Sequence, residues 1–456
     1  MKILHYFLGF PPYRTGGLTK YAYDLMCAQI DNGDEVSALW PGMIELKNNR
    51  PRIRKQKGIS GINNYELVNP LPVPLDEGIK ETDAFIKTCD LKIYIDLLEN
   101  IKPEVIHIHT LMGIHKEFFQ AANELKIRIV FTAHDYFGLC PKVTLFKRND
   151  VCDDDHCCND CVFCNQSALS LKKIWLMQSP LYRNLKNLKF IKFLRNKHRI
   201  DFFNDQILPS QTLLKDVDSK KYVVLRQFYI EMLSMVDCIH FNSTITESVY
   251  KRYFIPENSM VVNITHKDIA DNREKNTWSY TGKLRITSLA PAKPFKGFNV
   301  MIQALDELWQ SGKRDFELKI FCPVPVMKPY ISIQEGGFEY SQLPQIMADT
   351  DILIAPSVWY ETFGFTVLEA LSYGVPVIVS DHVGAKDIVQ NCGIIVRAGD
   401  IEDLKNAIER LDEETLRRMR ENIKKDFQIE TWIEYVNKNY SLYSTNDVNQ
   451  HHIGDK

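Results

Sequence analysis

The sequence predicts an α/β protein made of two doubly wound domains, each with a parallel sheet covered by helices on both faces. Short apolar runs typical of buried strands alternate with segments of helical periodicity along most of the 456 residues. This alternation stops in a polar stretch at residues 265–283 and then restarts. A chain of this length is also too long for one ordinary hydrophobic core. We therefore expect two domains that are joined near residue 270.

Each domain has its own set of predicted elements. In the first half we predict strands at 2–10, 34–41, 104–110, 127–135 and 237–243, and helices at 16–33, 116–126 and 244–254. In the second half we predict strands at 283–290, 316–323, 351–357 and 375–381, and helices at 298–312, 343–350 and 364–374. The predicted domains are 1–270, with a cysteine-rich and basic helical insertion at about 140–235, and 271–430. Residues 431–456 are predicted to form a C-terminal helix and tail that pack back across the domains.

Composition is that of a soluble globular protein, with 45% hydrophobic and 25% charged residues. The net charge of −2 provides no general attraction to nucleic acid or to an anionic membrane, so any such attraction has to be local. The N-terminal apolar run closes at Pro11 and Pro12, unlike a cleavable signal peptide, and no apolar run reaches about 18 residues. We expect a cytoplasmic protein that has no nucleic-acid partner.

One short stretch, "ETFGFTVLE" at 361–369, carries two glutamates around a glycine. A simple interpretation is a capping box, in which Thr366 and Glu369 satisfy free amides where a helix starts. That interpretation leaves Glu361 and Gly364 unexplained. The stretch follows a predicted strand, and open parallel sheets bind ligands at the carboxyl ends of their strands. We expect Glu361 in a loop and Glu369 in the first helical turn, both facing one cavity between the domains.

The segment 351–389 strongly resembles the Glu-x7-Glu region of retaining glycosyltransferases of family 4, which have the GT-B fold. Three other segments support the resemblance in the expected order, "PPYRTGGLTKYAYDLMCAQIDNGDEV", "EVIHIHT…VFTAHD" and "PFKGFNVMIQAL". A lone Glu-x7-Glu would be a weak signal, but these ordered segments extend the likeness over nearly the whole chain. The resemblance implies two Rossmann-like domains that face an interdomain cleft. The N-terminal domain would carry the acceptor and the C-terminal domain the nucleotide-sugar.

The resemblance assigns the donor-binding residues of the C-terminal domain. Glu369 would accept hydrogen bonds from the ribose hydroxyls, and Glu361 would hold hydroxyls of the transferred sugar. The amides of Gly364, Phe365 and Thr366 would meet the sugar and phosphate, because backbone N–H groups at a helix start favour anions.

Lys296 matches the family lysine that neutralises the diphosphate leaving group, although a solvated loop lysine is the simpler alternative. The family commonly has an arginine five residues earlier, where this chain has Pro291. Lys293 would then reach the phosphates as a point charge without a bidentate fork. Gly16 and Gly17 resemble the glycine loop that closes over the β-phosphate and the acceptor; an ordinary strand-to-helix turn is the alternative.

His134 matches the family histidine at the reacting sugar, and with Glu361 and Lys296 it forms the predicted catalytic set. Asp135 follows it on the acceptor side. In "HIH" we expect His107 and His109 to point to opposite faces of the sheet, with His109 facing the cleft on the acceptor side. A histidine that ends a strand is otherwise a structural residue.

By resemblance the reaction is a transfer with retention, in which fixed dipoles and the leaving diphosphate stabilise an oxocarbenium-like state. No residue is an obvious covalent nucleophile, and the leaving phosphate itself would take the acceptor's proton. No cofactor or metal is expected for catalysis. The predicted activity is hexosyl or deoxyhexosyl transfer to a glycan, lipid-linked acceptor in bacterial surface polysaccharide synthesis. The alternatives are a sugar-nucleotide epimerase, a non-catalytic nucleotide-sugar or glycan binder, and a zinc-finger nucleic-acid module.

Six cysteines crowd into residues 140–164: Cys140, Cys152, Cys157, Cys158, Cys161 and Cys164. Overlapping Cys-x-x-Cys pairs in a reducing compartment favour structural zinc over disulfides, with unligated thiols and redox chemistry as alternatives. The first choice of ligands is Cys152, Cys158, Cys161 and Cys164, with Cys140 and Cys157 as alternates. Such a site would shape the acceptor side next to His134.

Residues 161–200 contain no acidic side chain. The basic residues there are Lys172, Lys173, Arg183, Lys186, Lys189, Lys192, Arg195, Lys197 and Arg199. Apolar residues such as Trp175 and Leu185 are interleaved with them. This composition suits an interfacial helix on anionic lipid, which would hold the protein peripherally at the inner face of the cell membrane. A solvated helix face and a nucleic-acid contact are the alternatives.

Overall fold

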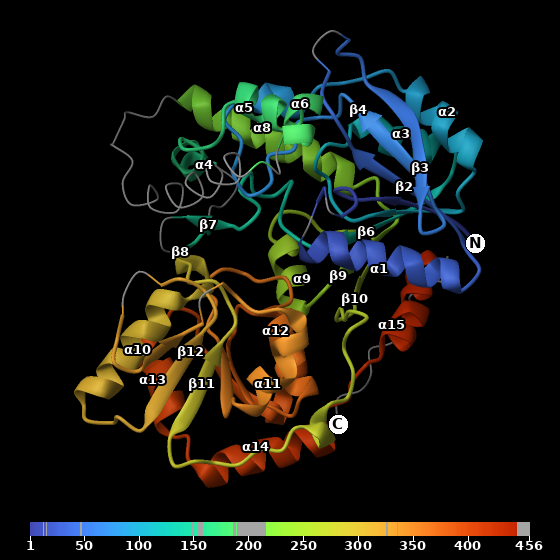
Figure 1. Cartoon of the computed structure of the whole chain (residues 1–456). Helices are drawn as coiled ribbons and strands as arrows, with labels where there is room; N and C mark the ends of the chain where they lie inside the picture. Colours follow the sequence, from blue (N-terminus) through green and yellow to red (C-terminus); the bar gives the residue numbers. More distant parts are fainter. Residues whose placement is uncertain are drawn as a thin grey trace.

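The structure, a computed structural model, describes residues 1–11, 13–14, 16–45, 48–147, 150–153, 158–185, 188, 216–324, 327–334 and 336–444. It contains two α/β domains, which lie one above the other in Figure 1. The first has an eight-stranded sheet in the order β10-β9-β6-β5-β1-β2-β4-β3, and the second a six-stranded sheet in the order β13-β12-β11-β14-β15-β16. The predicted fold class, two doubly wound α/β units, is therefore confirmed.

The first sheet is parallel except at one edge. Its strands are β1 (Lys2–Tyr6), β2 (Glu35–Pro41), β3 (Arg52–Ile59), β4 (Ile62–Val68), β5 (Val105–Ile108), β6 (Arg128–Ala133), β9 (Cys238–Phe241) and β10 (Ser259–Val261). The sequence interpretation missed β3 and β4. The strand β3 pairs antiparallel with β4 at the edge, and its sequence "RIRKQKGI" is half exposed and rich in charge. Edge strands are commonly charged, so they lack the buried apolar run by which the central strands are found.

Helices cover this sheet and build the insertion. The covering helices are α1 (Gly17–Asp31), α2 (Lys92–Ile101), α3 (Lys116–Glu124) and α9 (Thr244–Lys251). The insertion comprises the strands β7 (Phe146–Lys147) and β8 (Asp150–Val151), and the helices α4 (Asn159–Cys164), α5 (Leu171–Met177), α6 (Pro180–Leu185) and α8 (Asp216–Leu233). Figure 1 shows these elements at one end of the upper domain.

The second sheet is parallel throughout. Its strands are β11 (Leu284–Ser288), β12 (Phe316–Ile320), β13 (Ile331–Ile333), β14 (Ile352–Ala355), β15 (Val377–Ser380) and β16 (Gly393–Val396). The helices around it are α10 (Phe298–Gln310), α11 (Leu343–Ala348), α12 (Phe365–Ser372), α13 (Ile401–Glu409) and α14 (Glu413–Asp426). Its central strands are fully buried apolar runs, as expected for strands with helices on both faces.

Two segments connect the domains: the C-terminal segment that forms α15 and η8, and the helix α1. The helix α15 (Trp432–Asn439) and the short helix η8 (Tyr440–Tyr443) return from the end of the second domain to the first, where α15 lies beside α1 (Figure 1). The hydroxyls of Tyr21 in α1 and Tyr435 in α15 are 2.5 Å apart. Tyr21 also belongs to a buried cluster that includes Val367 and Leu371 of α12. The helix α1 therefore shares a buried cluster with α12 of the second domain.

Candidate active site

Glu361 lies in the loop between β14 and α12, and both of its carboxylate oxygens have partners. Oε1 accepts a hydrogen bond from Lys296 Nζ at 2.6 Å, and Oε2 accepts one from Ser357 Oγ at 2.6 Å. The main chain of Glu361 bonds to the segment after β15, donating to His382 O and accepting from Gly384 N, each at 2.9 Å. The carboxylate is therefore held in one place by groups from three separate segments.

Lys296 reaches Glu361 because the chain turns sharply after it. Lys296 ends the short helix η4 (Pro294–Lys296), and Gly297 follows with a φ of +75°. A Cβ atom at Gly297 would lie 1.9 Å from Pro356 O, so only glycine fits there. Lys296 Nζ also lies 5.0 Å from the ring centroid of Trp359. Lys296 and Glu361, two members of the predicted catalytic set that are 65 residues apart in sequence, are thus brought together.

Lys293, the proposed second cation, points to an aromatic side chain. Its Nζ lies 5.1 Å from the ring centroid of Phe295, the residue before Lys296. Lys293 therefore lies on the same short turn as Lys296, but it is not part of the ion pair with Glu361.

The helix α12 begins at a glycine. Its N-cap is Gly364, whose φ of +108° is rarely adopted by L-residues, and a Cβ there would lie 3.0 Å from Val383 Cγ1. The helix starts at Phe365 without a side-chain cap, so the capping-box interpretation of Thr366 is wrong. Glu369 consequently lies in the second turn, not in the first as expected. The positive φ of Gly364 moved the helix start two residues earlier than the cap pattern suggested.

Glu369 lies in a nearly closed environment and is 9% exposed. Its Oε1 is 3.4 Å from Nε2 of His266, a buried histidine that the sequence interpretation missed. Burial and then the charge of Glu369 raise the pKa of the Tyr340 and Tyr373 hydroxyls. His266 was overlooked because it lies in the polar stretch 265–283. The end of the apolar run just before it, "MVVNIT", is a signal that could have found it.

Two buried donors lie beside the two glutamates. In the part of the chain that the structure describes, Trp359 Nε1 has no hydrogen-bond partner, and neither has His266 Nε2, whose 3.4 Å contact with Glu369 Oε1 lacks hydrogen-bond geometry. A buried donor left without a partner costs about 1–3 kcal/mol, so each one calls for an explanation. A ligand that reaches both Glu361 and Glu369 would also pass both of these groups.

His134 directly follows β6, and its main chain contacts the loop that carries Glu361. Thr362 Oγ1, next to Glu361, donates to the main-chain oxygen of His134 at 3.1 Å, so the segments that carry these two residues meet across the domain boundary. The His134 ring centroid is 4.8 Å from that of Tyr21 in α1. Burial lowers the pKa of His134 to about 3. The ring is therefore neutral at neutral pH.

Asp135 is the other acidic group at this point. Burial raises its pKa to about 6, although a hydrogen bond from the Phe137 amide opposes the shift. That hydrogen bond is 2.9 Å long and ends on Oδ1. Asp135 therefore changes its charge close to neutral pH, whereas His134 does not.

The start of α9 holds the Glu361 loop against the first domain. Ser243 Oγ and Thr246 Oγ1 donate to Thr362 O at 2.8 and 3.0 Å. Thr244 donates to both carboxylate oxygens of Asp387, from its main chain at 2.7 Å and its hydroxyl at 2.6 Å. These side chains explain how His134 and Glu361 come to adjoin across the domain boundary.

His107 and His109 do not point to opposite faces of the sheet. Their ring centroids are 4.2 Å apart on the same face. The expectation was wrong because side chains alternate along a strand, so residues two apart share a face and the intervening Ile108 takes the other. His109 Nδ1 lies 3.4 Å from His134 Nε2, so His109 does adjoin the predicted site.

Gly16 and Gly17 form the start of α1. Gly16 is its N-cap with a φ of +123°, a conformation that favours glycine, and Gly17 is its first residue. A Cβ at either position would meet no atom within 4 Å, so the conformation and not the space calls for glycine at Gly16. The same helix carries Tyr21, which contacts His134.

Residues 284–414, which carry Lys296, Glu361 and Glu369, match the model of the family described as Glycosyl transferases group 1. This segment is a group 1 glycosyl transferase domain. It begins at the first residue of β11 and ends just after α13, so it contains the whole second sheet.

Two curated relatives are similar over parts of the chain. A protein of Escherichia coli named UDP-Gal:alpha-D-GlcNAc-diphosphoundecaprenol alpha-1,3-galactosyltransferase is 34% identical over 85 residues, which cover 18% of this chain and 22% of that protein. An uncharacterized 42.6 kDa protein in the cps region of Klebsiella pneumoniae is 21% identical over 320 residues, 69% of this chain and 66% of that protein. The chain thus spans about a fifth of the first relative and just under two thirds of the second.

Solved structures resemble the chain over nearly its whole length. Sucrose-phosphate synthase from Thermosynechococcus elongatus gives a TM-score of 0.53 at 14% identity, covering 97% of this chain and 98% of that chain. The Anabaena protein HepE in complex with UDP and glucose gives a TM-score of 0.51 at 13% identity, with the same coverage. Likeness at this identity shows the fold alone. The group 1 glycosyl transferase domain is thus the second of two Rossmann-like domains, and the predicted GT-B fold is confirmed.

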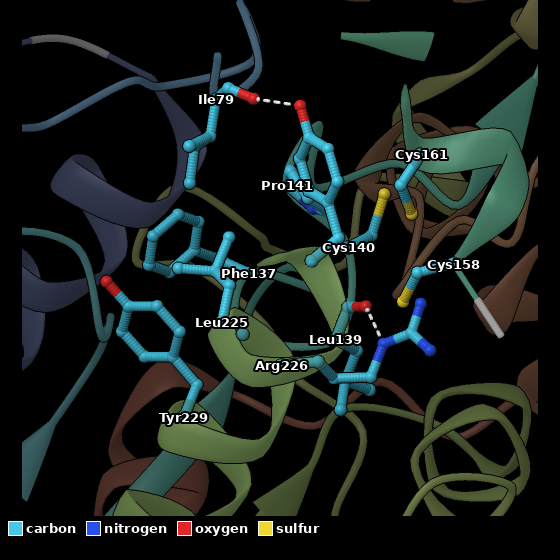
Figure 2. A pocket seen from close by; sticks show the side chains of 12 residues that line it. Ile79, Phe137, Leu139, Cys140, Pro141, Cys158, Cys161, Leu225, Arg226 and Tyr229 are labelled. Carbon is cyan, nitrogen blue, oxygen red and sulfur yellow. Dashed lines mark hydrogen bonds between the residues drawn. The ribbon is translucent and has the colours of Figure 1, made fainter. Parts of the chain in front are cut away.

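Of the six crowded cysteines, those that the structure describes lie in the first domain, outside the group 1 glycosyl transferase domain. Cys140, Cys158 and Cys161 line a small pocket with Arg226, and Figure 2 shows their thiols on one side of it. Hydrogen bonding with Cys158 and then burial raise the pKa of the Cys161 thiol, and burial raises that of Cys164 to about 12. A zinc ion would have to replace the proton of each such thiol.

No metal site is assigned to the cysteines that the structure describes. Among the described residues, the cysteines join no set of three His, Cys, Asp or Glu ligand atoms that all lie within 4.8 Å of one another. Cys157 lies outside the described residues. The zinc site, with Cys152, Cys158, Cys161 and Cys164 as ligands, stays a prediction. Metal analysis of protein purified without added metal tests it, with about one zinc per chain expected.

The basic stretch is only partly described. Lys172 and Lys173 are exposed on α5. Arg183, in contrast, pairs through Nη1 with Glu66 Oε1 at 3.3 Å, and its guanidinium lies over the Tyr13 ring. Lys186, Lys189, Lys192, Arg195, Lys197 and Arg199 lie outside the described residues. Exposed apolar side chains accompany the stretch, at Leu176, Leu181, Leu185 and Leu188. No helix in the described ranges has both the length and the apolar character needed to cross a bilayer.

Proposed function

We propose that the protein is a retaining glycosyltransferase of family 4 that moves a hexose or deoxyhexose from a nucleotide-sugar to a glycan acceptor. The observation that carries the proposal is the arrangement around Glu361. Its carboxylate is held by Lys296 and Ser357 at the start of α12, with Glu369 on the same helix and His134 opposite. The group 1 glycosyl transferase domain supports it, because this domain supplies the Lys296, Glu361 and Glu369 positions.

The charges of this arrangement suit a nucleotide-sugar. Lys296 places a positive charge where a diphosphate would develop negative charge on leaving, and Glu361 accepts hydrogen bonds from sugar hydroxyls. The main-chain amides at Gly364, Phe365 and Thr366 start α12, where N–H groups are free to meet an anion. Glu369 lies farther along the helix and is proposed to hold the ribose. The buried donors Trp359 Nε1 and His266 Nε2 would find acceptors on such a ligand.

His134 serves the reacting sugar as a neutral ring. A neutral imidazole offers one donor and one acceptor, so it can hydrogen-bond a sugar hydroxyl without placing a positive charge beside an oxocarbenium-like centre. Retention follows if the leaving phosphate takes the acceptor's proton on the face that it leaves. Asp135 and His109 are proposed to lie on the acceptor side. No catalytic metal is part of the proposal.

The acceptor is proposed to be a lipid-linked glycan in bacterial surface polysaccharide synthesis. The name of the E. coli relative includes a diphosphoundecaprenol acceptor, and the Klebsiella relative lies in a cps region. The exposed leucines of α5 and α6 beside the basic stretch suit an anionic membrane surface. We place the protein in the cytoplasm, peripherally at the inner face of the membrane, with no nucleic-acid partner.

The deciding experiment is a donor screen followed by product analysis. Purified protein is heated with UDP-, GDP- and TDP-sugars, since a bound donor raises the melting temperature. The stabilising donor is then incubated with a water-soluble glycan acceptor, and the anomeric configuration of the new bond is read by NMR. A product with the donor's configuration is expected. An inverted product contradicts retention, an epimerised nucleotide-sugar points to the epimerase alternative, and binding without turnover points to a non-catalytic binder.

A further inference from the structure

A row of buried polar side chains crosses one face of the first sheet. Its members on neighbouring strands are His5 in β1, His107 in β5, Thr132 in β6 and His240 in β9, and all four are completely buried. Such central parallel strands are usually apolar. Buried polar groups destabilise the folded state unless each one is hydrogen-bonded, so every member of this row needs a partner.

The first half of the row leads from His134 to the C-terminal helix. His134 Nε2 is 3.4 Å from His109 Nδ1, and His109 Nε2 is 3.0 Å from His5 Nδ1. His5 Nε2 is 2.7 Å from Oε1 of Gln29 in α1. The amide nitrogen of Gln29 donates to the hydroxyl of Tyr443 at 2.9 Å.

The second half leads from Tyr443 across the sheet to the main chain. The Tyr443 hydroxyl is 2.8 Å from His107 Nδ1, and His107 Nε2 is 2.7 Å from Thr132 Oγ1. Thr132 Oγ1 is 3.0 Å from His240 Nδ1. His240 Nε2 is 2.8 Å from the carbonyl oxygen of Val262. The two halves form one chain of eight links.

The end of this chain sets the direction of every hydrogen bond in it. A carbonyl only accepts, so His240 must donate from Nε2. Burial lowers the pKa of His240 to about 4, so the ring has no second proton and Nδ1 must accept from Thr132. Thr132 then accepts from His107 Nε2, because its one proton is used. His107, whose pKa burial lowers well below 6.5, accepts from Tyr443 at Nδ1.

The directions of the hydrogen bonds from Tyr443 to His134 follow in the same way. Tyr443 has given its proton to His107, so it accepts from the Gln29 amide, whose Oε1 then accepts from His5 Nε2. His5, with a pKa lowered to about 4 by burial, accepts at Nδ1 from His109 Nε2. His109 Nδ1 finally accepts from His134 Nε2. Every link agrees with one orientation, and Gln29 has the amide orientation that the direction requires.

We infer that this chain fixes His134 in the tautomer with its proton on Nε2 and a lone pair on Nδ1, and that Gln29 and Tyr443 are positioning residues. In the described part of the chain, Nδ1 of His134 has no protein hydrogen-bond partner. It is therefore the ring nitrogen left to accept a hydrogen bond from a bound molecule. The value of this for catalysis rests on the proposed function, in which that molecule is the reacting sugar and the partner a sugar hydroxyl.

The three rings of His5, His107 and His109 have ligand atoms within 4.8 Å of one another, a spacing that also suits a metal ion. All six ring nitrogens are, however, already within hydrogen-bond distance of another group of the chain. A metal would have to displace at least three of these contacts. The geometry therefore favours the hydrogen-bond chain.

Tyr443 makes the C-terminal segment part of this hydrogen-bond chain. It belongs to η8, which follows the second domain and packs on the first sheet with Leu442. Without the Tyr443 hydroxyl, the Gln29 amide can rotate and donate to His5 Nε2. Each ring from His5 to His134 would then shift its proton, and His134 would carry it on Nδ1.

The test reads the tautomers directly. Long-range ¹H–¹⁵N correlation spectra distinguish Nε2–H from Nδ1–H rings, and a His134→Gln variant assigns the His134 signal. We expect a single Nε2–H tautomer for His134 in the wild-type protein at neutral pH. A wild-type His134 with its proton on Nδ1 would overturn the inference, and so would histidine signals shifted by a stoichiometric bound metal. This readout needs no substrate, so it stands apart from the proposed function.

A matched pair of variants separates positioning from packing. Tyr443→Phe removes the hydroxyl in the chain, and Tyr440→Phe removes a neighbouring hydroxyl of η8 that donates to Asp34 instead. We expect Tyr443→Phe to bring the Nδ1–H form of His134 into the spectra and to lower turnover roughly tenfold, the rate equivalent of about one hydrogen bond. Tyr440→Phe should change neither. An unchanged tautomer in folded Tyr443→Phe would refute the role of Tyr443. The expected tautomer shift without any donor turnover would refute only the proposed function.

Discussion

The two halves of the site use opposite physical means. The half in the second domain is charged and partly open, with the Lys296–Glu361 ion pair at 2.6 Å and side chains 17% and 18% exposed. The half in the first domain is neutral and closed, because burial keeps the rings of His134 and His109 uncharged. Charges of this kind attract a charged ligand wherever it approaches, whereas neutral rings act only through the direction of their hydrogen bonds. The charged half, in the second domain, is suited to bind a donor, and the neutral half, in the first domain, is suited to orient a reacting group.

The largest expected effect is a loss of turnover on changing Glu361 in the charged half. Glu361→Gln removes one partner of the ion pair and the acceptor proposed for sugar hydroxyls. We expect the turnover number with the complete donor to fall by about 10²–10³-fold, as for other fixed electrostatic groups at a reacting centre. Steady-state kinetics measures it. Ser357→Ala leaves the charge pair and removes only one hydrogen bond, so its turnover should fall about tenfold at most. Equal losses in the two variants would contradict a special role for the charge.

The neutral half of the site should make the folded state less stable as the pH falls. Burial lowers the pKa of His5 and His240 to about 4 and that of His134 to about 3, against 6.5 when unfolded. Below pH 6.5 the unfolded chain binds more protons, so the free energy of unfolding falls as pH falls from 6.5 toward 4. Each of these histidines contributes up to about 1.4 kcal/mol per pH unit. Urea unfolding across this range measures the slope, and a flat profile would contradict the neutral, buried chain.

Asp135 should oppose this trend within the same half. Its pKa is raised from 3.8 to about 6, so the folded state binds more protons than the unfolded one between these values. Its contribution to stability therefore falls as pH rises through this window and stays lost above it. Asp135→Asn should raise the free energy of unfolding at pH 7 relative to wild type and steepen the acid loss. A destabilised variant at pH 7 would show that the carboxylate is needed for structure.

A smaller effect separates the two glutamates of the charged half. Glu369→Gln keeps the size of the side chain but removes its charge, so the ribose hydroxyls would lose an ionised acceptor. We expect the nucleotide to bind about tenfold more weakly, the equivalent of 1.4 kcal/mol, with a smaller change in turnover than in Glu361→Gln. Calorimetric titration with the nucleoside diphosphate alone measures this. Unchanged binding in Glu369→Gln would assign the ribose site elsewhere.

The smallest expected effect on activity concerns the basic stretch at residues 161–200, which is proposed to contact anionic lipid. Vesicles with anionic lipid should bind the protein, and binding should weaken as salt rises, because the Debye length is only about 8 Å at physiological salt. Replacing Lys186, Lys189, Lys192 and Arg195 with Gln should remove most of this binding, at about 1 kcal/mol for each cation. Activity on a short water-soluble acceptor should survive. Equal binding to neutral and anionic vesicles would make the stretch an ordinary solvated surface.

The residues of the charged half could be named from sequence patterns. Glu361, Gly364 and Glu369 lie within nine residues, and Lys296 lies in a short motif of its own, so local order alone was informative. Gly364 and Gly297 could be recognised as special because positive φ angles favour glycine whatever surrounds them. The parallel two-domain fold could also be predicted, because buried parallel strands appear in the sequence as continuous apolar runs.

The neutral half was decided by tertiary structure. His5, Gln29, Thr132, His240 and Tyr443 are ordinary residues in their own segments, and their meaning arises only where five distant segments meet on one sheet face. The sequence by itself determined the apolar frame and the residues that must be charged or flexible, because those depend on local chemistry. Which polar groups are buried, and in which direction their protons point, depends on partners up to 414 positions away. A hydrogen bond needs both of its atoms in place, and only the folded chain brings them together.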